Sequence, residues 1–76
     1  MKISDVIVVD KDILGGIPVF KGTRVPIKNL FDYLEAGDSL NDFLVDFDYI
    51  PKEYCLIVLK ASEKLLTDAQ LHENIN

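Results

Sequence analysis

Three of the four glycines and a Thr-Arg pair lie within one segment, GGIPVFKGTRVP at residues 15–26. A glycine-rich loop can hold a phosphate when it follows a strand and reads G-x-x-x-x-G-K-[ST]. Here Gly16 and Gly22 are six positions apart, and Thr23-Arg24 follows where that motif has lysine. The dinucleotide pattern G-x-G-x-x-G is also absent. The segment therefore does not predict nucleotide binding.

Nucleophiles and metal ligands are too few to predict catalysis. The single cysteine, Cys55, lies in an apolar run and is expected to be a core thiol. The single histidine, His72, lies in the polar residues 67–76 and is expected to face solvent. Asp42 and Asp46 share a helix face, but spacing places no further ligand beside them, and we expect that face to be solvated. We expect no enzyme, no metal, no cofactor and no small-molecule substrate.

Basic residues gather at the N-terminal end, although the net charge is −5. Residues 1–28 carry five basic and three acidic side chains, and the remainder carries three basic and ten acidic ones. Clustered Lys and Arg side chains bind the phosphate backbone of DNA. We therefore expect any DNA contact to come from Lys21, Arg24 and Lys28, on a β-ribbon that a dimer would present to the DNA. Alternatively, Arg24 contacts a nearby carboxylate or the carbonyls at a helix end. The acidic remainder either suits a basic partner or forms solvated helix faces.

A region of strands and turns over residues 1–26 must position these side chains. Val6–Val9 is predicted to be a short strand that ends before the Gly15-Gly16 break. Residues 18–20 and 23–25 flank Lys21-Gly22, which predicts a hairpin with a two-residue turn. Its register would place Phe20 opposite Thr23 and Val19 opposite Arg24. The residues predicted to shape this region are Gly15, Gly16, Pro18, Gly22, Thr23 and Pro26.

Three helices are predicted within residues 27–66, where the apolar period becomes 3.6. The first follows Pro26 and stops at Gly37. Ser39, with Asp42 three residues later, predicts a capping box for the second helix, which should end near Phe47. The third is predicted to have Pro51 in its first turn and to end near Leu66. Apolar stripes of the first two comprise Ile27, Leu30, Phe31 and Leu34, then Leu40, Phe43, Leu44 and Phe47.

The third helix is apolar around most of its circumference, which is typical of a buried helix. A domain of this length cannot surround such a helix, so we expect part of it to contact another chain. Dimerisation is also the remaining route to stability, because one cysteine allows no internal disulfide. We therefore expect a homodimer, with candidate partner-interface residues Tyr54, Leu56, Ile57 and Lys60.

These elements predict a single domain that is mostly α-helical with a small β part. It would comprise an N-terminal β-hairpin arm at residues 1–26, a three-helix bundle of the helix-turn-helix class at 27–66, and a polar tail at 67–76. No apolar run approaches the ~20 residues that span a bilayer, and the N-terminus lacks a signal-peptide pattern. We expect a soluble cytoplasmic protein.

Over residues 8–65 the chain resembles the small prokaryotic family called domain of unknown function 433. The resemblance lies in the order of Asp10, Gly16, Pro18-Val19, Gly22-Thr23-Arg24, Pro26, Leu30, Leu34, Gly37 and Ser39. It implies a homeodomain-like trihelical fold. For many members it also implies an antitoxin of the VapB type, encoded beside a PIN-like ribonuclease toxin. It implies no catalytic residues.

The chain departs from the family pattern before the third helix, where Pro51 follows Ile50 instead of a tyrosine and no hydroxyl cap is present. The acidic balance and the apolar third helix favour a protein-facing role. The leading hypothesis is an antitoxin-like module that dimerises and neutralises a PIN-like ribonuclease toxin, with repression of its own operon as a further role. The alternative is a stand-alone repressor whose basic ribbon binds operator DNA. A homodimeric scaffold with neither partner is a third reading.

Overall fold

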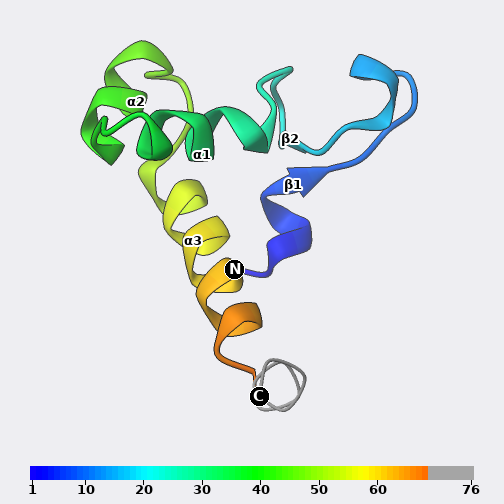
Figure 1. The fold of residues 1–76 in the computed structure, drawn as a ribbon. Helices are drawn as coiled ribbons and strands as arrows, with labels where there is room; N and C mark the ends of the chain where they lie inside the picture. Colours follow the sequence, from blue (N-terminus) through cyan, green and yellow to red (C-terminus); the bar gives the residue numbers. More distant parts are fainter. Residues whose placement is uncertain (69–76) are drawn as a thin grey trace.

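The computed structural model describes residues 1–68, so His72 and most of the predicted polar tail lie outside the described part. Three helices follow two short strands (Figure 1). The mostly helical class with a small N-terminal β part is confirmed. In chain order the elements are the 3₁₀ turn η1 (Ile3–Asp5), β1 (Ile7–Val8), the 3₁₀ turn η2 (Leu14–Gly16), β2 (Val19–Phe20), α1 (Ile27–Glu35), α2 (Leu40–Asp46) and α3 (Lys52–Leu66).

The helices do not form one parallel bundle. The helices α1 and α2 pack against each other at one end of the molecule, and the two strands lie beside the start of α1 (Figure 1). Helix α3 runs away from this body, and η1 lies against it near the N-terminus of the chain. Among residues 1–68, no helix is both long and apolar enough to cross a membrane.

The helix boundaries follow the local chemistry of the chain. The Ser39 hydroxyl accepts the Asp42 N–H at 3.0 Å, and an Asp42 carboxylate oxygen accepts the Ser39 N–H at 2.8 Å, which confirms the capping box. Hydrogen bonding by the Ser39 backbone N–H, and to a lesser extent by the Ser39 side chain, holds the pKa of the Asp42 carboxyl below its usual range. Gly37 ends α1 with a φ of +91°, which glycine adopts without strain. Pro51 lies just outside α3 as its N-cap residue, so its predicted place in the first turn is wrong.

The predicted strand at Val6–Val9 is present as β1, and its partner is β2. The pairing is antiparallel, with Ile7 opposite Phe20 and Val8 opposite Val19. The Lys21 N–H also donates to the Val6 carbonyl at 2.8 Å, which extends the ladder by one bond. The first two strands are therefore joined by the long connection that contains the Gly15-Gly16 break.

The predicted hairpin register around Lys21-Gly22 is wrong. On the other edge of β2, the Phe20 N–H donates to the Val25 carbonyl and the Ile27 N–H donates to the Pro18 carbonyl, both at 3.0 Å. Val19 thus lies opposite Pro26, and residues 21–24 form a four-residue loop. The segment that follows this loop contributes only the isolated Val19–Pro26 bridge and no further strand. Pro26 has no N–H with which to extend a ladder.

The core lies where β2, α1 and α2 meet the first half of α3. Phe43 is its centre, since its ring is fully buried and contacts three other aromatic rings. Cys55 is also fully buried, which confirms the predicted core thiol. The buried members are Val6, Val19, Phe20, Val25, Ile27, Leu30, Phe43, Ile50, Cys55 and Val58.

Candidate interaction surfaces

A side-chain hydroxyl closes the loop that carries Lys21 and Arg24. The Thr23 Oγ1 donates to the Phe20 carbonyl at 2.8 Å and accepts the Val25 N–H at 3.0 Å. Within the loop, Gly22 has a φ of +80°, which only glycine adopts readily. The loop therefore has a fixed shape that leaves the Lys21 and Arg24 side chains exposed.

Replacing Thr23 by valine is expected to destabilise the loop. The substitution keeps the side-chain shape but removes the hydroxyl, which leaves the part-buried Val25 N–H without a partner. The expected loss is about 1–3 kcal/mol of unfolding free energy, measured by urea denaturation. The matched control is Thr23→Ser, which retains both hydrogen bonds and should stay much closer to wild type. Equal losses in the two variants would show that the hydroxyl does not hold the loop.

The three predicted DNA contacts have different surroundings. Within residues 1–68, the Arg24 side chain makes no hydrogen bond or ion pair, so the alternative of a clamp onto a local carboxylate is not found there. Lys28 lies in the first turn of α1, where its Nζ contacts both carboxylate oxygens of Asp32 at 2.8 and 2.9 Å. The hydrogen bond to Asp32 raises the pKa of Lys28, so the amine stays charged but is already paired. Lys21 and Arg24 are thus the available cations of the loop.

The segment from residue 29 to residue 48 carries only acidic charge, and we call its exposed carboxylates the acidic face. It contains six carboxylates and no lysine or arginine. All six are exposed, and they are Asp32, Glu35, Asp38, Asp42, Asp46 and Asp48. The Tyr33 hydroxyl donates to Asp46 Oδ2 at 2.6 Å, which connects α1 to α2 and raises the pKa of Tyr33. Four of these carboxylates are therefore held on two helices that contact each other, and Asp38 and Asp48 lie in the turns that follow them.

The predicted partner-interface residues of α3 differ in exposure. Leu56 and Lys60 are exposed, whereas Tyr54 and Ile57 are half-buried and pack against the core. Lys60 pairs with Glu63 at 2.9 Å, which lowers the pKa of Glu63.

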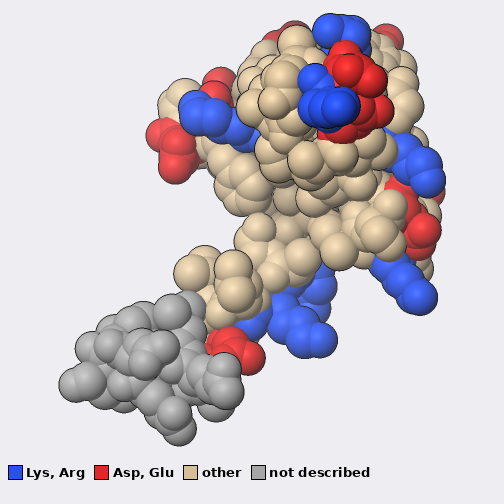
Figure 2. Space-filling view, turned by 90° about the vertical axis from the view of Figure 1, so that its right-hand side faces the viewer, with Lys and Arg blue, Asp and Glu red and all other residues tan. Residues whose placement is uncertain are grey.

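The distal end of α3 carries exposed apolar residues that are not among the predicted partner-interface residues. Leu65 is 70% exposed and Leu66 is 64% exposed. Figure 2 shows uncharged atoms extending from the body along this end of the described chain, with charged side chains along one side.

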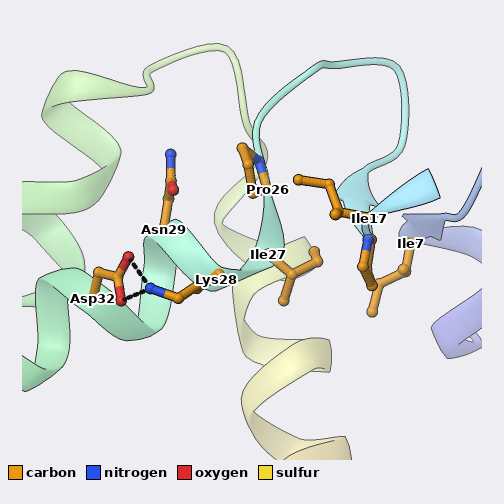
Figure 3. Close-up of a pocket in the computed structure, with 8 residues that line it drawn as sticks. Ile7, Ile17, Pro26, Ile27, Lys28, Asn29 and Asp32 are labelled. Atoms are coloured by element: carbon orange, nitrogen blue, oxygen red, sulfur yellow. Dashed lines mark hydrogen bonds and ion pairs between the residues drawn. The ribbon is translucent and has the colours of Figure 1, made fainter. Parts of the chain in front are cut away.

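An open apolar groove of about 620 Å³ lies between the strands and the start of α1 (Figure 3). The strand side contributes Ile7, Ile17 and Pro18, and the α1 side contributes Pro26 and Ile27. The Lys28–Asp32 ion pair and Asn29 form its polar margin (Figure 3). Two pairs of a proline and an apolar residue, at 17–18 and 26–27, line this groove, although their sequence pattern predicts only turns.

These features define a small, mostly helical domain with charged and apolar surfaces, and residues 1–68 contain no cluster of side chains able to hold a metal ion. The chain belongs to the family described as protein of unknown function (DUF433), whose model matches residues 7–59. The match confirms the family resemblance of the sequence. It includes the Thr23 loop and the acidic face, and it ends before the distal part of α3. Curated proteins and solved structures gave no significant match.

Proposed function

We propose that this protein is a non-enzymatic, antitoxin-like interaction module of the cytoplasm that dimerises and neutralises a PIN-like ribonuclease toxin. The observation that carries the proposal is the acidic face, with six exposed carboxylates and no basic residue between residues 29 and 48. A ribonuclease must hold RNA, so its substrate-binding surface should present cations. An acidic partner of fixed shape can cover such a surface.

The state of the individual carboxylates supports this role. Asp42 and Asp46 accept hydrogen bonds within the domain, which hold their side chains in place. Within the described residues, Glu35, Asp38 and Asp48 make no side-chain hydrogen bond or ion pair. These three carboxylates can therefore meet a cationic partner without breaking contacts inside the domain. Their attraction also speeds association, and this effect weakens with added salt.

Co-expression with the ribonuclease encoded beside the gene, followed by calorimetry and an RNA-cleavage assay, tests the proposal. The triple variant Glu35→Gln, Asp38→Asn, Asp48→Asn should weaken binding on the order of tenfold or more and reduce inhibition of RNA cleavage. The matched control is Asp12→Asn, an exposed carboxylate outside the acidic face. Absence of a complex at micromolar concentration, or wild-type binding by the triple variant, would overturn the proposal.

A second candidate function is repression through operator DNA, either of the same operon or by the protein alone. The observation that favours it is the pair Lys21 and Arg24, held outward on one loop. Helix α2 carries only acidic charge, so phosphates would repel it from the major groove.

Arg24→Ala should weaken binding to the upstream promoter and lower the slope of log K against log salt by about one for a lost phosphate contact. Lys11→Ala, which removes an exposed cation outside the loop, serves as the control. Absence of a gel shift with wild-type protein at low salt would exclude this function for the isolated protein.

A further inference from the structure

The buried stripe of α3 continues past the body of the domain. Cys55 and Val58 are fully or nearly fully buried, and Ser62, Leu65 and Leu66 follow them at helical spacing. Burial declines along this stripe, and the two leucines are mostly exposed. The same apolar side of the helix therefore loses its cover where α3 leaves the body (Figure 1).

The N-terminus adds apolar surface to this end of the molecule. Turn η1 packs against α3, and both Ile3 within it and the preceding Met1 are exposed. We define the distal face as Met1, Ile3, Ser62, Leu65 and Leu66. A patch of exposed large side chains built from two chain segments is typical of a protein interface.

Two polar side chains near the distal face already have partners. The Ser62 hydroxyl donates to the Val58 carbonyl at 3.0 Å, so covering it leaves no unpaired donor. Lys60 is paired with Glu63, and residues 60–66 contain two basic and one acidic side chain. The segment is therefore close to neutral, in contrast to the acidic face.

This charge pattern selects a second copy as the occupant. A two-fold interface brings one patch against itself, so a neutral patch is tolerated and a charged one is repelled. Ten residue steps along α3, at about 1.5 Å each, separate Ser62 from the end of the helix near α2 by roughly 15 Å, and Leu66 is roughly 20 Å from that end. These distances are close to or greater than two screening lengths of about 8 Å at physiological salt. A cationic partner would instead be attracted to the acidic face.

We propose that two copies pair through their distal faces, with the α3 helices antiparallel around Ser62. The small serine lets the helices approach closely, and the antiparallel arrangement places the two acidic faces at opposite ends. Leu65 and Leu66 of each copy then pack beside the other copy's η1. The pairing specifies the dimer included in the proposed function, and it leaves both acidic faces free for a ribonuclease.

Sedimentation equilibrium of the full chain without any ribonuclease tests this pairing independently of toxin binding. Wild type should dimerise, and the double variant Leu65→Glu, Leu66→Glu should raise the dimer Kd by at least about a hundredfold. The matched control is Val45→Glu, because Val45 is 75% exposed on α2 and belongs to neither the distal face nor the predicted partner interface. It should dimerise as wild type does, and circular dichroism should show that all three proteins are folded.

A cysteine at the predicted two-fold axis gives a second readout. Ser62→Cys should form an intermolecular disulfide on mild oxidation, whereas Lys60→Cys on the polar side should not. A wild-type monomer at several hundred micromolar, a dimeric double variant, or a monomeric Val45→Glu would overturn the pairing. If the wild type is a monomer and the double variant no longer binds the ribonuclease, then the distal face is a ribonuclease-binding surface. That result would also overturn the proposed pairing.

Discussion

Replacement of Phe43 by alanine is expected to lower the free energy of unfolding by about 3–5 kcal/mol. The Phe43 ring is fully buried, and the ring centroids of Phe47, Tyr33 and Phe20 lie 4.8, 5.3 and 6.0 Å away. Alanine would leave a cavity where α1, α2 and β2 meet. Domains of this length have a total stability of about 4–11 kcal/mol, so this loss is a large fraction of the total.

Urea denaturation followed by circular dichroism, at one fixed protein concentration, measures this loss. Val45→Ala is the control, because Val45 lies on the same helix and is 75% exposed. Its unfolding free energy should stay within about 0.5 kcal/mol of wild type. Equal stability of the two variants would show that Phe43 is not the centre of the core.

The Cys55 thiol is expected to react with iodoacetamide on the order of a thousandfold or more slowly in the folded protein than in the unfolded chain. The side chain has no exposed surface, so alkylation requires the domain to open. Mass spectrometry of samples quenched with and without urea measures the two rates. Comparable rates would contradict the burial of Cys55 in solution.

The same burial predicts how stability depends on alkaline pH. Burial raises the pKa of Cys55, so the folded protein keeps the thiol proton at a pH where the unfolded chain has lost it. Stability from this group is fully present below the unfolded pKa of about 8.5 and falls as pH rises above it. Between about pH 8 and pH 10, Cys55→Ala should lose stability less steeply than wild type. An unchanged slope would show that the thiol does not contribute.

Local patterns predicted the helices well because their signals lie within a few residues. The Ser39–Asp42 cap, the stop at Gly37 and the buried Cys55 all follow from neighbouring side chains. The family was also identified from motif residues alone.

The predicted hairpin register was wrong because the Lys21-Gly22 pair is typical of a two-residue turn. In the structure the Thr23 hydroxyl instead closes a four-residue loop. That hydroxyl bond depends on backbone geometry that no residue pattern displays. The apolar groove and the distal face were missed for a related reason. Each arises where segments remote in sequence meet, as Ile7 meets Ile27 and η1 meets α3.

The contact between η1 and α3 joins the two ends of the described chain. During synthesis the N-terminal residues emerge first, and they must wait for α3 to leave the ribosome before this contact can form. The β1–β2 pairing and the α1–α2 contact connect segments much nearer in sequence, so they can form earlier. A nascent chain therefore passes through a stage in which the strands and first two helices are present while Val6 and Phe43 still lack the cover of α3. Release of the last helix, rather than assembly of the N-terminal half, sets the moment at which the newly made protein becomes resistant to proteases.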